Sequence, residues 1–381
     1  MASTKIVKLD SLNIKVDYLK EAADILADGG LVIIPTETVY GIAANMADAR
    51  ALERLYKIKQ RPKDKPFSLL IDTKEKIEDF AQDIPVSAYK LMDKFWPGPL
   101  TLILKSRNKP SSCAQGLGKD TIGIRMPDDN IALRIIALSG VSVVCPSANI
   151  SGKPAPVNFP DAIKNLEGLV DFAIDAGNTR LGMESTVVDL TVEPTRILRE
   201  GAIKKEDIEA AIQKKAVLFI CTGNSCRSVM ARALLEKALK EKNRDDVEVL
   251  SAGIMMLEGL TATDEVKELL RREGIDVSAH RSQKVTRDMI KKSDIILVME
   301  KLHEKRALEL VPEVKNRLFL LKEFANPVRN THINSLVKIS NGTKISDNYL
   351  DIVDPIGRPF EFYAQTLGVI KEAIGRISNL I

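Results

Sequence analysis

The sequence predicts an α/β fold arranged as two domains. Short apolar runs typical of strands alternate with amphipathic runs typical of helices along the whole chain. The 381 residues exceed what one ordinary hydrophobic core organises. A charged helical run at residues 204–215 separates the two halves. We therefore expect a first domain at residues 1–205, a linker at 206–215 and a second domain at 216–381.

The first half is expected to alternate helices and strands. Apolar residues recur at helical spacing in the helix candidates, which are residues 16–28, 49–59, 87–95 and 130–139. Short, nearly continuous apolar runs mark the strand candidates, which are residues 31–34, 100–104, 121–125, 141–145, 186–190 and 195–198.

The second half also alternates strands and helices, beginning with a new strand at residue 216. Strands are expected at residues 216–220, 247–251 and 295–299, and helices at 229–240, 263–273 and 360–377. Residues 327–348 are polar and irregular, which predicts a flexible insertion before the last helix.

Composition and charge narrow the classes of function. Aromatic residues are 4% of the chain, which argues against a base-stacking surface, and the net charge of +4 suits anionic ligands without indicating nucleic-acid binding. The four cysteines and three histidines show no spacing typical of a metal site or a disulfide scaffold. Because neither a signal peptide nor a long apolar run is evident, we expect a cytoplasmic protein without a membrane partner.

A strand-to-helix turn in the second half holds a thiol. Cys221 follows an apolar strand and Val229 begins an amphipathic helix. The backbone N–H groups and helix dipole at such a turn favour an oxyanion or a thiolate. Cys221 is therefore the candidate nucleophile, and Arg227 can bind two phosphoryl oxygens in a fork. The remaining phosphate-loop candidates are Thr222, Gly223, Asn224, Ser225, Cys226 and Ser228.

An Asp-Pro pair lies far downstream of this loop. Pro355 restricts the local backbone, and Asp354 is placed on a loop just before the last helix. A carboxylic acid there could protonate a leaving group. Together with the cysteine loop, it supplies the general acid that cleavage of a phosphate ester or phosphoramidate needs.

The second half resembles the low-molecular-weight protein tyrosine phosphatase family. The resemblance rests on the loop of residues 221–228, on Ser251-Ala-Gly253, on His280-Arg-Ser282 and on Asp354-Pro355. It implies a doubly wound, four-stranded parallel sheet, no metal or other cofactor, and a covalent phosphocysteine intermediate. It also implies that Cys221 is the nucleophile, Arg227 binds phosphate and Asp354 acts as general acid and then base. In such enzymes the second loop cysteine, here Cys226, can form a reversible disulfide with Cys221.

Two departures from the family pattern bear on the phosphorylated substrate. Tyrosine-specific members tend to carry aromatic residues after Asp-Pro, whereas Ile356 and Gly357 follow here. Ser225 stands where those members often have a bulkier aliphatic residue. Both features resemble the bacterial arginine-phosphate phosphatases of this family, so phosphotyrosine and phosphoarginine proteins both stay open. Thioredoxin-coupled arsenate reductases need further downstream cysteines, and none follows Cys226.

Polar side chains gather at the predicted strand ends of the first half. They lie in five segments, at residues 35–41 (Pro-Thr-Glu-Thr-Val-Tyr-Gly), 57–65, 121–125, 146–152 and 184–199. Ligands bind at strand ends in α/β sheets, so cations and hydroxyls there suggest a polyanion such as ATP. No Gly-rich P-loop is present, so the nucleotide is not held as in the common NTPases.

The first half resembles the threonylcarbamoyl-adenylate synthase family over roughly residues 12–205. The resemblance rests on residues 35–41, 96–101 (Trp-Pro-Gly-Pro-Leu-Thr) and 184–186, and on the Lys59/Arg61 and Ser147/Asn149 pairs. It implies a twisted mixed sheet and a nucleotidyltransferase that makes threonylcarbamoyl-AMP and pyrophosphate from L-threonine, bicarbonate and ATP, with Mg²⁺. The product serves threonylcarbamoyladenosine (t6A) modification of tRNA, so proteins of that machinery are expected partners.

The same resemblance implies the residues of the synthase site. The ATP-binding residues would be Lys59, Arg61, Thr121, Ser147, Asn149 and Arg199. The threonine-binding residues would be Thr38, Arg125 and Ser185. Two positions depart from the family: Ala155 replaces a serine near the nucleotide, and Leu70 replaces a histidine that contacts threonine in some members.

Each half also has a non-enzymatic interpretation. The first half could be an RNA-binding module with a basic cleft, although the low aromatic content and modest charge count against this. The second half could be a catalytically silent regulatory domain, although Cys221, Arg227 and Asp354 are all intact. The favoured interpretation is a bifunctional enzyme, a synthase fused to a hydrolase.

Overall fold

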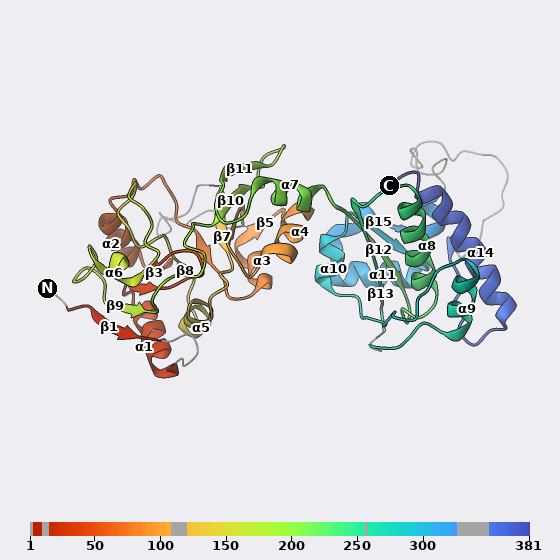
Figure 1. The fold of residues 1–381 in the computed structure, drawn as a ribbon, viewed down its shortest axis with the longest axis horizontal. Helices are drawn as coiled ribbons and strands as arrows, with labels where there is room; N and C mark the ends of the chain where they lie inside the picture. Colours follow the sequence, from red (N-terminus) through yellow and green to blue (C-terminus); the bar gives the residue numbers. More distant parts are fainter. Residues whose placement is uncertain (1–2, 10–14, 108–119, 256–257, 326–349) are drawn as a thin grey trace. The chain divides into compact units, whose positions relative to one another are not determined.

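The computed structural model of the chain describes residues 3–9, 15–107, 120–255, 258–325 and 350–381, and the predicted insertion at 327–348 lies outside them. The chain divides into two compact units, Met1–Ile212 and Gln213–Ile381 (Figure 1). Each unit contains its own sheet, and each is described separately below.

The first unit is a mixed α/β structure. Its strands are β1 (Lys5–Lys8), β2 (Val32–Ile34), β3 (Gly41–Asn45), β4 (Leu69–Leu70), β5 (Ala81–Gln82), β6 (Leu100–Ser106), β7 (Thr121–Arg125), β8 (Val143–Val144), β9 (Phe172–Asp175), β10 (Thr186–Asp189) and β11 (Arg196–Arg199). Its helices are α1 (Val16–Ala27), α2 (Ala49–Lys59), the 3₁₀-helix η1 (Lys74–Lys76), α3 (Ile77–Phe80), α4 (Val86–Phe95), α5 (Asn130–Ser139), α6 (Phe159–Ile163) and α7 (Lys205–Gln213).

One sheet organises this unit in the described residues. Its order is β1-β9-β2-β3-β8-β4-β7-β6-β10-β11, and β5 pairs with β6. Parallel pairs such as β6 with β10 occur beside antiparallel pairs such as β6 with β7, so the predicted mixed sheet is confirmed. Successive side chains of β2 enter different cores: Ile33 packs with α2 and α6, whereas Val32 and Ile34 pack with α1 and α5. Helices therefore cover both faces of the sheet.

The segment expected as a linker is largely helical. Residues 205–213 form α7, and Lys215 already begins the first strand of the second unit. Ile208 is fully buried in the core that β6, β7 and α4 share, because the apolar face of the charged helix packs there. The helical run is thus an integral part of the first unit's core.

The second unit is a doubly wound parallel structure. Its strands are β12 (Lys215–Cys221), β13 (Val247–Gly253), β14 (Ile295–Val298) and β15 (Leu318–Leu320). Its helices are α8 (Arg227–Glu241), α9 (Asp264–Arg272), α10 (Arg287–Lys292), α11 (Lys301–Leu310), the 3₁₀-helix η2 (Pro312–Arg317), α12 (Leu321–Phe324) and α14 (Phe360–Ile377). The strand order is β13-β12-β14-β15, and every pair is parallel, as predicted.

Alternate residues of β12 face two different cores. Val217 and Phe219 pack against α8, α9 and α14, whereas Leu218 and Ile220 pack against α10 and α11. A strand buried on both faces explains its unbroken apolar sequence. Because β12 lies between β13 and β14, its carboxyl end is the point where the chain turns to either side, which is where doubly wound sheets bind ligands.

No helix among the described residues is long and apolar enough to cross a membrane.

Candidate active sites

The cysteine loop of the second unit lies between β12 and α8. Cys221 is the last residue of β12 and Arg227 is the first of α8, so the loop joins the carboxyl end of the central strand to a helix N-terminus. Both side chains are buried, with relative exposures of 2% for Cys221 and 1% for Arg227. The backbone N–H groups of the loop and the helix dipole act together at this point.

Ser228 links the nucleophile to the loop. Its Oγ lies 2.9 Å from Cys221 Sγ and accepts a hydrogen bond of 3.0 Å from Asn224 Nδ2. The hydroxyl proton of Ser228 is therefore available to the sulfur, as the sequence predicts. A hydrogen-bond donor beside the sulfur stabilises a thiolate over a thiol.

Asn224 holds the loop in its curved form. Its φ of 52° is left-handed, a conformation that asparagine tolerates better than most residues. Its amide nitrogen also donates to Ser251 Oγ (3.0 Å), and its Oδ1 accepts from the backbone N–H of Gln283 (3.0 Å). His280 Nε2 lies 2.7 Å from the backbone oxygen of Asn224, and burial lowers the pKa of this imidazole. The neutral ring can thus donate from Nε2.

The end of β13 packs directly under the loop. A Cβ built on Gly253 would lie 2.7 Å from Thr222 O, 2.9 Å from Asn224 N and 3.0 Å from Gly223 C, all backbone atoms. We expect Gly253→Ala to displace the loop and lower phosphatase kcat/KM by about tenfold or more, since small misplacements of reacting groups are costly. Gly368→Ala in α14 is the matched control, because nothing lies within 4 Å of its Cβ position. Equal activity of the two variants would contradict this expectation.

Arg227 is held by four groups of the second unit. Its Nη1 donates to the backbone oxygen of Ile352 (2.7 Å) and lies 3.0 Å from Glu300 Oε2. Its Nη2 donates to Thr222 Oγ1 (2.9 Å) and to Asp354 Oδ2. Its Nε is buried and has no hydrogen-bond partner among the described residues. The guanidinium therefore brings the predicted general acid to the loop.

A buried histidine, His303, forms a hydrogen bond with Thr222, the threonine that also contacts Arg227. His303 Nδ1 accepts from the backbone N–H of Glu300 (3.0 Å), so Nε2 carries the proton and donates to Thr222 Oγ1 (3.0 Å). Burial, and to a lesser degree the charge of Arg227, lower the pKa of His303 to about 3. The ring is neutral at ordinary pH and does not act as a proton donor to substrate near neutrality.

Because His303 is neutral when folded, the free energy of unfolding of the second unit depends on pH. The unfolded imidazole titrates near pH 6.5 and the folded one near 3, so the unfolded chain binds the extra proton as the pH falls between these values. We expect the second unit to lose up to about 1.4 kcal/mol per pH unit there from this group. Thermal unfolding midpoints at pH 7 and 5 should differ less in His303→Gln than in the wild type. An unchanged pH dependence would show that His303 does not contribute.

Cys226 is the last residue of the loop and is a free thiol. Its Sγ is 3.7 Å from Thr263 Oγ1 and 3.7 Å from Ser225 Oγ, and burial raises its pKa to about 11. Cys221 and Cys226 are both reduced. A disulfide between them stays a prediction.

The first unit contains a polar pocket at the carboxyl ends of several strands. The pocket has a volume of about 170 Å³. The residues that line it include Thr36, Tyr40, Arg61, Phe67, Ser68, Leu70, Thr101, Arg125, Cys145, Ser147, Glu184, Ser185 and Arg199. Three arginines and several hydroxyl groups thus surround one small space, which suits an anionic ligand.

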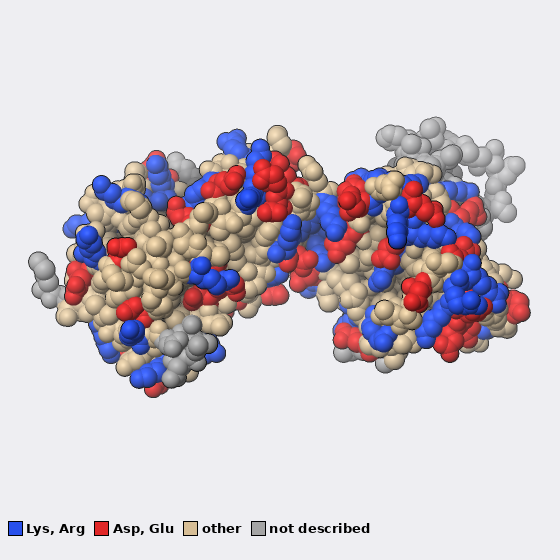
Figure 2. All heavy atoms as spheres, in the orientation of Figure 1, with Lys and Arg blue, Asp and Glu red and all other residues tan. Residues whose placement is uncertain are grey.

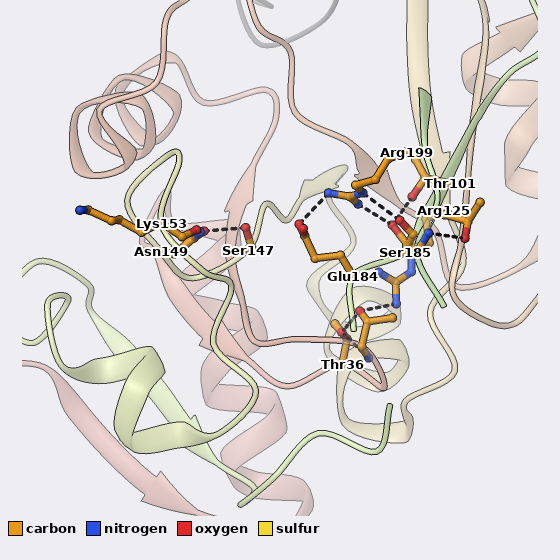
Figure 3. A network of polar contacts seen from close by, with 12 residues as sticks. Thr36, Thr101, Arg125, Ser147, Asn149, Lys153, Glu184, Ser185 and Arg199 are labelled. Carbon is orange, nitrogen blue, oxygen red and sulfur yellow. Dashed lines mark hydrogen bonds and ion pairs between the residues drawn. The ribbon is translucent and has the colours of Figure 1, made fainter. Parts of the chain in front are cut away.

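A buried ion pair forms the floor of this pocket. Arg125 ends β7, and its Nη2 lies 2.8 Å from Glu37 Oε1 and donates to Thr38 Oγ1 (2.9 Å). Thr38 Oγ1 lies 2.9 Å from Thr36 Oγ1. Glu37 and Thr38 follow β2 and are almost completely buried, so the turn after this strand fixes the orientation of the arginine. Figure 3 shows Arg125 beside Thr36 at this floor.

Arg199 and Ser185 form the opposite wall. Arg199 donates from Nε to the backbone oxygen of Ser185 (3.0 Å) and from Nη2 to Ser185 Oγ (3.1 Å), and its Nη1 lies 2.6 Å from Glu184 Oε1. Ser185 Oγ is also 2.9 Å from Thr101 Oγ1 (Figure 3). The antiparallel pair β10 and β11 places these side chains together.

Lys59 fixes the loop that follows β8. Its Nζ donates to the backbone oxygens of Ser147 and Asn149 and to Asn149 Oδ1. Ser147 Oγ in turn donates to Asn149 Oδ1 (2.6 Å). Burial, and next the charge of Arg61, lower the pKa of Lys59 to about 8. The cation is therefore directed at the loop rather than into open solvent.

The structure brings most of the predicted synthase residues together. Arg61, Arg125, Ser147, Ser185 and Arg199 line the pocket, while Thr38, Lys59 and Asn149 contact its lining residues. Thr121 is the exception, because it begins β7 while Arg125 ends it, and four extended residues span about 13 Å. Four further residues line the pocket, and one more pairs with a lining residue, although none of them has an individual role predicted from the sequence: Thr36, Thr101, Cys145 and Glu184, and Glu37, which pairs with Arg125.

A second cavity adjoins the Asn149 loop. It has a volume of about 390 Å³, and its lining includes Asn149, Lys153, Ala155, Pro156 and Lys164. Asn149 Nδ2 donates to the backbone oxygen of Lys153, which closes the loop between the two cavities. Ala155 lies in this cavity and Leu70 lines the first pocket, so both departures from the family pattern fall at these cavities.

Two family models match the chain. The Sua5/YciO/YrdC model, described as "Telomere recombination", matches residues 24–201. The model described as "Low molecular weight phosphotyrosine protein phosphatase" matches residues 216–378. The first match falls within the first compact unit and the second match within the second, and the two do not overlap.

Curated relatives and a solved structure agree with both matches. The threonylcarbamoyl-AMP synthase of Pyrococcus abyssi is 45% identical over 195 residues, which are 51% of this chain and 57% of that protein. The protein-arginine-phosphatase of Geobacillus stearothermophilus is 35% identical over 163 residues, 43% of this chain and 93% of that protein. A crystal structure of P. abyssi Sua5 complexed with L-threonine aligns with a TM-score of 0.52 and 29% identity, covering 83% of this chain and 99% of that one.

The match to the synthases is partial on their side. The chain spans 57% of the P. abyssi synthase and 59% of the Bacillus subtilis synthase. From the two models and these relatives, the chain belongs to the Sua5/YciO/YrdC family of threonylcarbamoyl-AMP synthases in its first unit and to the low-molecular-weight phosphotyrosine protein phosphatase family in its second.

Proposed function

We propose that the chain is a bifunctional enzyme in which each unit is a separate catalytic domain. The first would be a threonylcarbamoyl-AMP synthase domain at residues 1–205, and the second a cysteine-dependent protein phosphatase at residues 216–381. The identity of each half to relatives named for these activities supports the proposal. The observation that carries it is the pair of preassembled polar sites, one in each unit.

The proposed synthase reaction combines L-threonine, bicarbonate and ATP. The threonine amine takes up bicarbonate carbon as a carbamate with loss of water. A carbamate oxygen then attacks the α-phosphorus of ATP, and the bond to pyrophosphate breaks. A P. abyssi homologue crystallised with L-threonine supports a threonine site in this fold. The product would supply t6A modification of tRNA, and the proteins of that machinery are the proposed partners.

The residues around the pocket have complementary proposed roles. Thr38, Arg125 and Ser185 would hold threonine. Arg61 and Arg199 would neutralise charge on the departing pyrophosphate, which is how cations accelerate phosphoryl chemistry. The remaining proposed ATP-binding residues are Lys59, Thr121, Ser147 and Asn149. The adjoining cavity lined by Lys153 and Ala155 offers room for the rest of the nucleotide.

Magnesium would enter with the nucleotide. The described residues contain no cluster of three His, Cys, Asp or Glu side chains that could hold a metal ion. Glu184 is the acidic residue among those lining the pocket. A single carboxylate with substrate phosphates fits Mg²⁺, which keeps several waters and is seldom caged by protein alone. Glu184 would hold the ion, which would shield the phosphate charges.

The test of the synthase proposal is substrate dependence. Pyrophosphate release by the full chain should require threonine and bicarbonate together with ATP. Binding of RNA without such turnover would instead favour the RNA-binding alternative. On the face shown in Figure 2, basic and acidic side chains are interspersed over both units rather than forming a continuous basic stripe, which supports the enzyme.

The proposed phosphatase reaction has two steps. Cys221 Sγ attacks phosphorus, the bond from phosphorus to the leaving group breaks, and Asp354 gives that group a proton. Water then attacks the phosphocysteine, Asp354 accepts the water's proton, and the phosphorus–sulfur bond breaks to release phosphate. Ser228 would stabilise the sulfur as it leaves, and Arg227 would hold two phosphoryl oxygens.

Phosphoarginine proteins are the proposed substrates of this site. The residue after Asp354-Pro355 is Ile356, which is 55% exposed and offers no aromatic wall to a phenyl ring. A relative named protein-arginine-phosphatase is 35% identical. The test compares phosphoarginine and phosphotyrosine peptides with the full chain. A higher kcat/KM for phosphotyrosine would overturn the substrate choice, and no turnover of either would favour a silent regulatory domain.

A further inference from the structure

Glu300 forms an ion pair with Arg227, the proposed phosphate-binding arginine. The proposed chemistry gives Glu300 no role. It lies between β14 and α11, directly before the first residue of that helix. Its Oε2 is 3.0 Å from Arg227 Nη1, and its side chain is 23% exposed. The arginine itself is 1% exposed, so this contact replaces solvent for a buried charge.

The N–H donors of the Arg227 guanidinium can be counted to find which of them is free to bind a phosphoryl oxygen. Arginine has five N–H donors in a planar fork. One on Nη1 is donated to Ile352 O, and the same nitrogen forms an ion pair with Glu300 Oε2 at 3.0 Å. The two on Nη2 face Thr222 Oγ1 and Asp354 Oδ2. The fifth, on Nε, has no partner among the described residues although it is buried.

The free donor lies on one particular edge of the guanidinium. Nε and Nη2 form the edge that can bind two oxygens of one anion at once. Thr222 and Asp354 now accept from Nη2, one nitrogen of that edge. Glu300 and Ile352 lie at the opposite nitrogen, Nη1. An arriving phosphoryl group can take the Nε donor and displace Asp354 from Nη2.

We propose that Glu300 is a positioning residue of the phosphatase site. It holds the Nη1 side of Arg227 so that the Nε–Nη2 edge faces the phosphoryl group, and it keeps the arginine partly neutralised when Asp354 leaves to act as the acid. This inference rests on the proposed phosphatase function. In this role the Glu300 carboxylate fixes the guanidinium of Arg227 at the nitrogen opposite its phosphate-binding edge.

Removing the carboxylate has two expected consequences. Arg227 loses the partner that fixes its Nη1 side, so the phosphate-binding edge is less well oriented. Asp354 becomes the nearest carboxylate left to the buried cation, so it is held more tightly on Nη2 and competes with the phosphoryl group. Both effects weaken binding of phosphate and lower kcat/KM.

The experiment compares three variants of the full chain. Glu300→Ala removes the contact, and Glu300→Gln keeps an oxygen that can accept from Nη1 without the charge. Glu309→Ala is the matched control, because Glu309 lies on α11, the helix that Glu300 precedes, and pairs with Arg306 at the surface. Each is assayed for phosphate-ester kcat/KM, for calorimetric binding of inorganic phosphate, and for the unfolding temperature of the second unit as a check on folding.

The expected result separates positioning from structure. Glu300→Ala should lower kcat/KM and phosphate affinity by about 10- to 100-fold, the range for residues that orient a ligand-binding group. Glu300→Gln should retain most of both, and Glu309→Ala all of both. Wild-type phosphate affinity in Glu300→Ala would overturn the inference, as would equal losses in Ala and Gln variants accompanied by a lower unfolding temperature.

The two proposals can fail separately. A wild-type chain that binds inorganic phosphate but hydrolyses no phosphate compound would defeat the proposed function. The effect of Glu300→Ala on phosphate binding would still be measured in that case. A wild type that hydrolyses phosphoarginine, together with an unaffected Glu300→Ala, would defeat only the positioning role.

Discussion

Cys221→Ser is expected to lower phosphate-compound hydrolysis by on the order of 10⁴-fold or more, because loss of a covalent nucleophile removes the whole reaction route. Serine preserves the size of the side chain and its position 2.9 Å from the Ser228 hydroxyl. What it lacks is the sulfur atom that the proposed reaction uses as its nucleophile. The measurement is kcat/KM for p-nitrophenyl phosphate and a phosphoarginine peptide.

Cys226→Ser is the matched control for this prediction. The two cysteines occupy one loop and are both buried, but burial raises the pKa of Cys226 to about 11 and its sulfur faces Thr263. Its replacement should leave hydrolysis within a few-fold of the wild type. Comparable residual activity in Cys221→Ser and the wild type would refute the nucleophile assignment. A loss confined to Cys226→Ser would point to the wrong cysteine.

Arg125→Gln is expected to produce the largest loss of stability in the first unit. The substitution leaves Glu37 almost completely buried without its ion-pair partner. Breaking a buried pair in this way typically costs about 3–5 kcal/mol. Denaturant unfolding of the full chain should show an earlier transition for the first unit and an unchanged one for the second.

A double variant separates stability from turnover. Glu37→Gln with Arg125→Gln removes both charges, so the uncompensated carboxylate disappears and much of the lost stability should return. Threonine-dependent pyrophosphate release should stay low, because the proposed threonine site lacks its cation. Recovery of wild-type turnover in the double variant would show that Arg125 has only a structural role.

The long periodic elements of both units could be predicted from the sequence alone. The closing helix α14 has the predicted bounds, Phe360–Ile377, and β7 and α5 agree equally well. These segments have strong hydrophobic patterns that their tertiary contacts reinforce. The helix α8 begins at Arg227 rather than at residue 229, because the loop ends directly before Arg227.

Several short strands could not be predicted. The strands β1 and β9 have four residues each and pair with each other across more than 160 residues of sequence, so no local pattern reveals them. The strand β3 (Gly-Ile-Ala-Ala-Asn) has one β-branched residue and no aromatic residue, so its pattern is weak, and it is held in place by β2 and β8. β15 has only three residues.

The residues of the candidate sites likewise include some that could be predicted from the sequence and others that could not. Cys221, Arg227 and Asp354 could be found because their chemistry is visible in two short motifs, the loop of residues 221–228 and the Asp354-Pro355 pair. Glu300 could not, because the helix that follows it, α11, was not predicted and its contact crosses 73 residues of sequence. Glu37 was quoted within residues 35–41 without a role, since only the folded turn shows that it pairs with Arg125.

The fusion itself predicts independent catalysis, since each unit has its own core and its own site. The most direct test of the bifunctional assignment supplies the full chain with ATP, threonine, bicarbonate and a phosphoarginine peptide, and follows release of pyrophosphate and phosphate in the same sample. The wild type should release both, and Cys221→Ser should release pyrophosphate at the wild-type rate without phosphate from the peptide. Release of neither product by the wild type, or loss of both in Cys221→Ser, would contradict two catalytic units in one chain.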